Sequence, residues 1–494
     1  MSNASTDSRT PIERHVWLVA AVVGMGSVMS ILAVTIVNVA LESLSTELHS
    51  PLDDIQWVAT GYLLGMGAVI PVSAWISARF GARRAYLASL ALFVLTSLLC
   101  AVAWSATSLI AFRVLQGAAG GLTLPLGQMM LAHAAGPQRL GRVMSVIGVP
   151  MVIGPMIGPI VGGLLIDQLS WHWIFVINIP FGIASLVMGL KLLPRDAATH
   201  AAGRLDVTGL LLLCAGVPAV IYGLSRTSAA GGFLSTTVLI PTLIGLALIA
   251  LFARHALRRD EPLLDIRLLG QRGFAAASVA TFASGAALYG AMLLLPLYFQ
   301  GVRGEDALHA GLLLIPQGLG SALSMGIAGR LADRVGGARV AVVGLTTMAL
   351  ATVPLAFLTA ATSYWLISAV LFVRGLGLGG GVMPLMAASF ATLRRPSDIA
   401  HATPQLNVLQ RVGGSVGTAI LTVVLSSRLG VAPDLDAAAA AFDHAYWWAV
   451  GVSALAVLPA LYLARLERRA RGARRPVAPV ADDPRTGEHP AVAA

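Results

Sequence analysis

Apolar residues run along the chain in long blocks, and short polar loops separate each block from the next. Most blocks hold roughly 20 residues with few charges, which is the length that a helix needs to cross a bilayer. This pattern predicts an all-α integral membrane protein with fourteen spanning segments. The predicted segments are 16–41, 55–78, 84–104, 107–131, 141–166, 173–193, 207–225, 234–256, 274–300, 308–331, 338–358, 363–388, 404–426 and 445–465.

The composition supports a membrane protein and argues against a nucleic-acid-binding one. Of the 494 residues 57% are hydrophobic and 11% are charged, whereas a soluble domain is about 25% charged. The net charge is +10, but the arginines gather in short loops and in the tail. Cys100 and Cys214 lie in apolar runs, so no disulfide framework is expected. The first apolar run lacks the features of a cleaved signal peptide and is predicted to stay as a helix.

The charges in the loops predict the orientation. Alternate loops carry most of the arginines, namely Arg79, Arg83, Arg84, Arg139, Arg142, Arg195, Arg204, Arg258, Arg259, Arg267, Arg272, Arg334, Arg339, Arg394 and Arg395. The opposite loops carry only Arg226, Arg303 and Arg428, together with the carboxylates Glu47, Asp53, Asp54, Glu305, Asp306, Asp434 and Asp436. Positively charged loops stay in the cytoplasm, so both termini are predicted to be cytoplasmic.

The fifth apolar run contains a regular set of glycines and prolines. Gly154, Gly158 and Gly162 recur every fourth residue and therefore lie along one side of a helix, where they let another backbone come close. Pro155 and Pro159 each lack an N–H and free a carbonyl one turn earlier. On spacing alone the run predicts a tightly packed, kinked spanning helix.

The whole string from Gly148 to Gly163 resembles a known motif. It matches, almost completely, the antiporter motif of helix 5 in the major facilitator superfamily, G-x(5)-G-P-x-x-G-P-x-x-G-G. The end of the first segment, Leu32 to Leu41, resembles the L-D-x-T-I-V-N-V-A-L signature of the fourteen-span drug:proton antiporters. Ala33 occupies the aspartate position of that signature, while Asn38 is retained. Asn38 is expected either to form an interhelical hydrogen bond or to line a cavity.

Two loops resemble the loop motif of the same superfamily, G-x-L-A-D-R-x-G-R-R. The first copy retains Arg79, Gly81 and Arg83, but Ala74 replaces its glycine and Ala78 its aspartate. The second copy is more complete and contains Gly329, Asp333, Arg334 and Gly336. The resemblance implies that Asp333 and Arg334 form a cytoplasmic ion-pair latch and that Ala78 cannot. For the arginines alone, setting the orientation is the simpler explanation.

The two loop copies are about 255 residues apart, which predicts a parallel repeat of two halves. The six spans of the first half together with two inserted spans account for this separation of about 255 residues. The predicted divisions are a cytoplasmic tail (1–15), a first six-helix half (16–193), two inserted helices (194–256), a second half with its lead-in loop (257–465) and a basic, disordered tail (466–494).

The charges inside the predicted spans are Arg113, Arg374 and Arg411. Arg113 with Gln116 and Gly117 resembles the superfamily's R-x-x-Q-G motif. An arginine at mid-bilayer costs about 2.5–3.5 kcal/mol, so Arg113 is expected to face a polar interior or to find a partner. Otherwise it extends to the outer surface.

No Asp or Glu is predicted deep in any span, although a proton-coupled exporter usually needs a carboxylate. Three alternatives follow. Glu42 could take over the role, coupling could run through the latch and Arg113 with the substrate, or the protein has lost proton coupling. The same absence disfavours multivalent cations and suggests neutral or anionic substrates.

Residues expected to line a substrate cavity combine polar, aromatic and methionine side chains, because methionine adapts to varied apolar ligands. They are Asn38, Tyr62, Met129, Tyr289, Gln300 and Arg411. For the methionines and aromatic residues, packing between helices is the simpler explanation.

The sequence therefore predicts an inner-membrane exporter of amphipathic small molecules that works by alternating access in exchange for protons. A facilitator without proton coupling and a non-transporting sensor are the alternatives. No nucleophile–base constellation or metal-ligand spacing indicates an enzyme, and no cofactor or metal is expected. The expected partners are the substrate, protons and the lipid bilayer, with a periplasmic adaptor protein left open.

Overall fold

The computed structural model describes residues 13–136, 139–196, 204–227, 232–359, 361–393, 395, 398–429 and 435–473. The first twelve residues and the tail from 474 onward lie outside this part, and so do the predictions made for them. Side chains of several residues in the fifth span, and that of Asn38, are also outside it.

Every regular element of the described residues is helical. In chain order they are α1 (Arg14–Thr35), α2 (Val37–Glu47), α3 (Leu52–Val69), η1 (Ile70–Val72), α4 (Ser73–Phe80), α5 (Ala82–Ala101), α6 (Ala106–Ala135), α7 (Leu140–Gln168), α8 (Trp173–Val176), α9 (Asn178–Leu192), α10 (Val207–Ser225), α11 (Thr236–Arg258), η2 (Ile266–Gly270), α12 (Arg272–Gly301), α13 (Ala307–Leu312), α14 (Ile315–Val335), α15 (Gly337–Thr352), η3 (Val353–Phe357), α16 (Tyr364–Ala391), α17 (Ile399–Leu429) and α18 (Leu435–Ala473).

Thirteen helices of the described residues are long and apolar enough to cross a membrane. α7, with 29 residues, is a further long helix. The predicted segments coincide with these helices, and that of α10 agrees at both ends. This confirms the all-α membrane fold. The count of fourteen spans is compatible with it.

The last predicted segment is too short at both ends, because α18 begins at Leu435 and runs to Ala473. Its first turns contain five consecutive alanines, 437–441, which favour a helix strongly without being very hydrophobic. The helix therefore includes Asp443, which the sequence prediction left outside the spans. It also continues through residues 466–473, which were predicted to be disordered tail.

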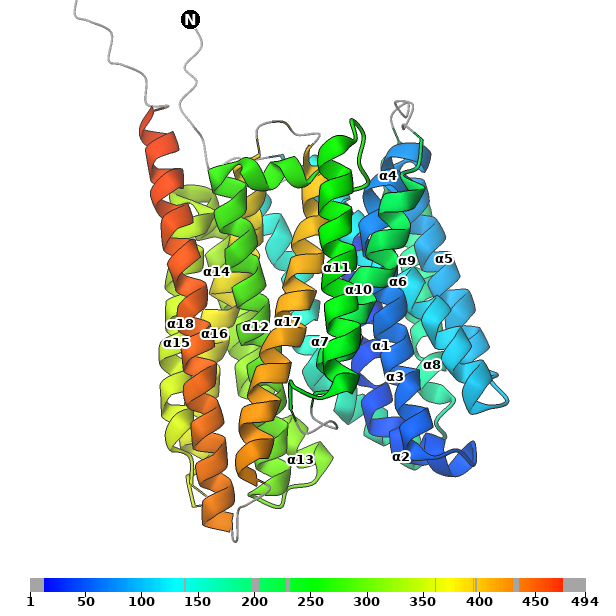
Figure 1. Ribbon diagram of the computed structural model, residues 1–494, viewed down its shortest axis with the longest axis vertical. Coiled ribbons are helices and arrows are strands. Elements are labelled where there is room, and N and C mark those ends of the chain that lie inside the picture. Colours follow the sequence, from blue (N-terminus) through cyan, green and yellow to red (C-terminus); the bar gives the residue numbers. More distant parts are fainter. Residues whose placement is uncertain are drawn as a thin grey trace, which may run out of the picture.

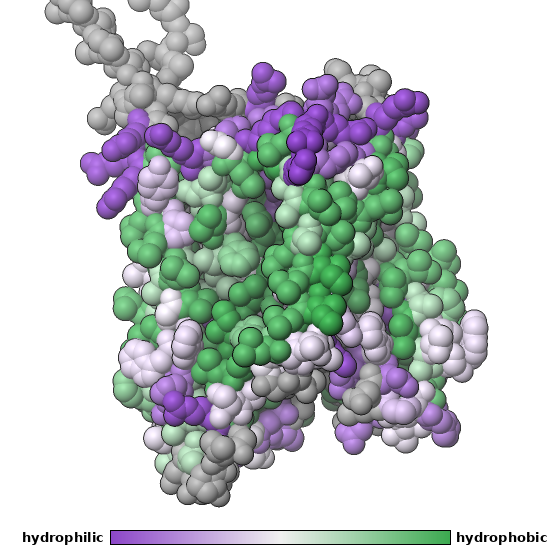
Figure 2. Space-filling model, in the orientation of Figure 1, coloured by the Kyte–Doolittle hydropathy of each residue, from purple (hydrophilic) through white to green (hydrophobic). Residues whose placement is uncertain are grey.

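The helices run side by side (Figure 1), between two ends that carry hydrophilic side chains (Figure 2). The first and last described helices, α1 and α18, have their free ends at the same end of the bundle. That end carries a dense band of hydrophilic side chains above an apolar belt (Figure 2). We call it the arginine-rich end, after Arg79, Arg83, Arg142 and Arg334 in the terminal turns of its helices.

Equivalent pairs of helices pack in the same way in the two parts of the bundle. α6 packs on α3 and α5, and α16 packs on α14 and α15. Gly65 of α3 lies against the backbone of Val114, and Gly320 of α14 lies against that of Phe372. Close backbone contact of this kind needs glycine. α10 packs against both α3 and α17.

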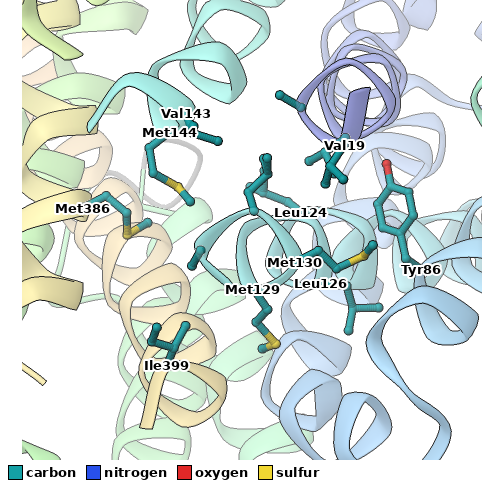
Figure 3. Close-up of a cluster of buried hydrophobic side chains, with 14 of the residues drawn as sticks. Val19, Tyr86, Leu124, Leu126, Met129, Met130, Val143, Met144, Met386 and Ile399 are labelled. Carbon is teal, nitrogen blue, oxygen red and sulfur yellow. The ribbon is translucent and has the colours of Figure 1, made fainter. Parts of the chain in front are cut away.

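The buried apolar side chains form different clusters at the two ends. At the arginine-rich end one cluster takes residues from both halves, among them Met129, Met144, Met386, Ile399 and Leu406. We call it the shared cluster; Figure 3 shows most of these side chains converging from α6, α7, α16 and α17. At the opposite end the first half and the second half have separate clusters. The two halves therefore share a buried apolar cluster at the arginine-rich end, whereas at the opposite end they meet where α7 packs on α13, with Ile160 close to Gly311.

Candidate transport pathway

Arg113 lies fully buried in α6 and does not extend to the surface. Its Nε donates to the carbonyl of Val58 at 2.9 Å, and its Nη1 donates to Oε1 of Gln116 at 2.6 Å. The guanidinium carbon lies 4.3 Å from the centre of the Tyr62 ring. Gln116 in turn donates to Oγ of Ser97 at 2.7 Å. The arginine charge is thus held by a carbonyl, an amide and an aromatic face.

The second half contains a matching site around Arg374 of α16. Its Nη1 donates to Oε1 of Gln317 at 2.6 Å and its Nε to Oγ1 of Thr352 at 3.2 Å. Gln317 and Thr352 lie 255 residues after Tyr62 and Ser97, respectively. Sequence reasoning named Arg374 but missed its partners, although the 255-residue offset of the loop motifs points to both positions.

Arg411 is placed differently from the other two arginines. It lies near the middle of α17, is half-buried, and is close enough to Tyr62 to interact with it electrostatically. Within the described residues its guanidinium makes no hydrogen bond or ion pair. Two of the three arginines in the spans are thus enclosed by partners, and the third remains available.

Asp333 joins the two halves at the arginine-rich end. Its Oδ1 accepts the backbone N–H of Gly141 at 2.9 Å, and its Oδ2 accepts Nε of Arg142 at 2.7 Å. Only 5% of its side chain is exposed. The carboxylate therefore sits at the N-terminus of α7, where the helix dipole favours negative charge. The backbones of Gly141 and Gly329 touch at the same place.

The loop glycines of both motif copies have positive φ, 90° at Gly81 and 111° at Gly336. Each glycine precedes a helix whose first amides are capped by a carboxylate from far along the chain. Asp196 accepts N–H of Arg83 at 2.8 Å, and Glu467 accepts N–H of Ala338 at 3.0 Å. Sequence reasoning found neither cap, because nothing in the local sequence links these residues.

The remaining arginines of the motif lie near these caps. Arg83 donates from Nη2 to the carbonyl of Leu190 at 2.7 Å. Arg79 is exposed, and so is Ala78 beside it. Arg334 lies in the last turn of α14, next to Asp333.

A second contact joins the halves at the same end, through amides rather than charges. Nδ2 of Asn407 on α17 donates to Oε1 of Gln128 on α6 at 2.7 Å, and both side chains are buried. Sequence reasoning did not identify this contact, because its two residues lie 279 positions apart. We call the Asp333 contact the ion latch and the Gln128–Asn407 contact the amide latch.

The antiporter-motif glycines of α7 face α1. Side chains added at Gly154, Gly158 and Gly162 would meet Ile31, Thr35 and Ile36. Thr35 donates to the carbonyl of Gly154 at 3.4 Å. α7 remains one helix through Pro155 and Pro159, whose side chains lie outside the described part.

The ends of the motif have other surroundings. A side chain at Gly148 would meet Met325 and Met383 of the second half, whereas nothing lies within 4 Å of one at Gly163. Glu42 is exposed on α2 and lines a cavity of about 370 Å³ at the end opposite the arginines. That cavity also contains Glu47 and borders Gly163.

The other predicted cavity residues are dispersed. Met129 is buried in the shared cluster. Tyr289 is half-buried and packs over Gly414 of α17. Gln300 is exposed beside the end of α12. Among the described residues no group of three His, Cys, Asp or Glu side chains could hold a metal ion.

Comparisons with known proteins agree with this architecture. The profile described as Major Facilitator Superfamily matches residues 23–418 and 277–486. A "Multidrug resistance protein B homolog" of Mycobacterium tuberculosis strain H37Rv is 42% identical over 82% of this chain and 76% of its own length. The "Putative multidrug resistance protein MdtD" of Escherichia coli O6:H1 is 29% identical over 93% of this chain and 96% of its own.

A solved structure shares the fold at low sequence identity. The human organic anion transporter MFSD10 (TETRAN) matches with a TM-score of 0.63 and 17% identity, over 92% of this chain and all of that one. Long helices, the repeated packing and the matching profile lead to one conclusion. The chain is a multi-pass transporter of the plasma membrane, not an enzyme, and belongs to the Major Facilitator Superfamily.

Proposed function

We propose that this transporter exports amphipathic small molecules, drugs among them, from the cytoplasm by alternating access in exchange for protons. The observation that carries the proposal is the buried apolar cluster that the two halves share at the arginine-rich end, together with the two latches there. With the arginine-rich end in the cytoplasm, the structure corresponds to a state closed to the cytoplasm. The names of the multidrug-resistance relatives support the substrate class.

In this mechanism the two halves rock about the centre of the bundle. Opening toward the cytoplasm requires the shared cluster to separate and both latches to break. The ion latch restores the closed state because Asp333 returns to a helix N-terminus and to Arg142. α7 is held against α1 by its glycine face and therefore moves with the first half.

Proton coupling needs a group that binds and releases a proton during the cycle. Ala33, at the family's aspartate position, is buried and cannot serve. We assign the role to Glu42, which lies on α2 beside the cavity at the outer end. The second candidate function is a facilitator without proton coupling, which the alanine at position 33 favours.

Substrate-driven proton movement distinguishes these functions. Inverted membrane vesicles are energised, and the proton gradient is followed with a pH-sensitive dye while neutral, anionic and cationic compounds are added. An antiporter that uses Glu42 dissipates the gradient in the wild type but not in Glu42→Gln. Substrate transport without proton movement, restored to coupling by Ala33→Asp, would establish the uncoupled facilitator. No transport of any compound would overturn the proposed export.

A further inference from the structure

We propose that Arg411 is the recognition site for the carboxylate of an amphipathic organic anion, at the floor of the outward-facing pathway. This inference rests on the proposed export function and adds its substrate class.

One face of α17 is polar along most of the helix. Its residues are spaced by three or four positions and so lie in one row. They are Asn407, Arg411, Ser415, Thr418 and Thr422. The neighbouring face of α17 packs on α12, where Gly413 meets Phe282 and Gly417 meets Ala286. The polar row is therefore not the face that packs on α12.

One hydrogen bond and one longer-range electrostatic interaction place the polar row toward the first half. Asn407 donates to Gln128 on α6, and Arg411 interacts with Tyr62 on α3. Beyond Asn407, toward the outer end, Arg411 and the three hydroxyl residues are half-buried. At that end the two halves have separate apolar clusters. Arg411 therefore lies one turn beyond the amide latch, half-buried and outside the shared cluster.

The partners of the arginines separate Arg411 from the other two. Arg113 and Arg374 are fully buried and each donates to two fixed groups. None of the ion pairs of the described residues includes Arg411. A cation inside a membrane protein marks a site where an anion or a dipole is bound.

A guanidinium binds a carboxylate through two parallel hydrogen bonds, which makes an organic carboxylate the fitting ligand. Tyr289 of α12 is half-buried and packs over Gly414, which lies less than one turn from Arg411 on α17. Its ring offers an aromatic surface for the apolar body of the ligand. The nearby positive charge of Arg113 disfavours a cationic ligand in the same place.

A matched set of probes tests this inference: a pyrene with a butyrate chain, its methyl ester, and the analogue with a trimethylammonium group. Uptake into inverted vesicles is measured for the wild type, Arg411→Gln and Arg411→Lys. Arg428→Gln is the control, because Arg428 lies exposed at the outer end of the same helix. We expect uptake of the carboxylate probe by Arg411→Gln to fall about tenfold relative to the wild type. Ester transport should stay unchanged, and Arg411→Lys should recover part of the loss.

An equal loss for all three probes, or no preference for the carboxylate in the wild type, would overturn the inference. If no probe is transported, the proposed export function is refuted. The Arg411 site is then tested separately, by measuring binding of the probes to the purified protein in nanodiscs. Carboxylate binding in the wild type but not in Arg411→Gln upholds the site, and equal binding overturns it. Suppression of binding by phosphatidylglycerol nanodiscs would assign the site to a lipid headgroup instead.

Discussion

The contact between α7 and α14 and the contact between α6 and α17 close the same end of the transporter with different chemistry. In the first, Asp333 receives a backbone N–H and an arginine, next to touching glycine backbones. In the second, two buried amides share one hydrogen bond. A charge-assisted contact is about twice as strong as a neutral one, so the ion latch is the stronger of the two.

The two copies of the loop motif explain this difference. The second copy keeps Gly329 and Asp333, and both are used in the ion latch. The first copy has Ala74 and Ala78 at these positions, and Ala78 is exposed. The glycine allows the close approach that the aspartate needs to reach a helix end. The glycine and the aspartate of the motif therefore act as a pair. The contact between α6 and α17 has neither residue and depends on the side chain of Gln128 on α6 instead.

The largest effect should come from displacing α7, which carries one side of the ion latch. In Gly158→Leu the new side chain would collide with Thr35 and push α7 away from α1. We expect loss of transport, measured as uptake in inverted vesicles. Gly451→Leu is the matched control, since this glycine is exposed on α18 and no atom lies within 4 Å of a side chain added there. Full transport by Gly158→Leu, with the protein inserted normally, would contradict this prediction.

A smaller loss is expected when the ion latch loses its charge. Asp333→Asn can still accept the N–H of Gly141 but no longer pairs with Arg142. Hydrogen bonds to charged groups contribute about 1.5–3 kcal/mol, so the equilibrium should shift roughly 10- to 100-fold toward the state open to the cytoplasm. Double electron–electron resonance between spin labels on the cytoplasmic loops would measure this shift. An unchanged distance distribution would refute the role of the latch.

The amide latch should matter less than the ion latch. Asn407→Leu leaves Gln128 buried without its partner, and polar contacts between membrane helices contribute about 0.6–1.7 kcal/mol. We expect the same equilibrium to shift roughly 3- to 15-fold. Replacing Gln128 by leucine as well should restore much of the loss, because no buried amide is then left unpaired. If Asn407→Leu shifted this equilibrium more than Asp333→Asn does, the amide latch would be the stronger of the two contacts, which would contradict this prediction.

Restoring only the aspartate of the first motif copy, at position 78, should have the smallest effect on transport. Ala78→Asp introduces a carboxylate at an exposed position, where an ion pair contributes at most about 1 kcal/mol. Ala74 remains beside it and keeps the backbones apart. The transport rate should therefore change by less than about fivefold. A gain well above that limit would show that the first copy can form an ion latch without its glycine.

The positions of the spans could be predicted from the sequence because a bilayer imposes one length and one polarity on every crossing helix. α10 matches its predicted limits, and most other limits differ by a few residues. The start of α18 was missed because an alanine run with Asp443 resembles a polar loop in hydropathy. Helix propensity was the better guide there.

The side-chain partners could be predicted only in part. Sequence resemblance named Asp333 and Arg113, but it did not identify Gln317, Asp196 or Gln128 as members of the polar contacts. Such partners lie dozens to hundreds of residues apart, and only tertiary packing brings them together. Met129 has the composition expected of a ligand pocket yet lies in the shared cluster, because an apolar side chain fits either environment.

The central claim is that the bundle is closed at its cytoplasmic end and open at its outer end. Cysteine labelling with a membrane-impermeant maleimide tests it most directly, using Thr418→Cys on the polar row and Ala402→Cys in the shared cluster, each compared with the unsubstituted protein. The account predicts that Thr418→Cys reacts from the outer face, and that Ala402→Cys reacts from neither face. Reaction of Thr418→Cys only from the cytoplasmic face would contradict it.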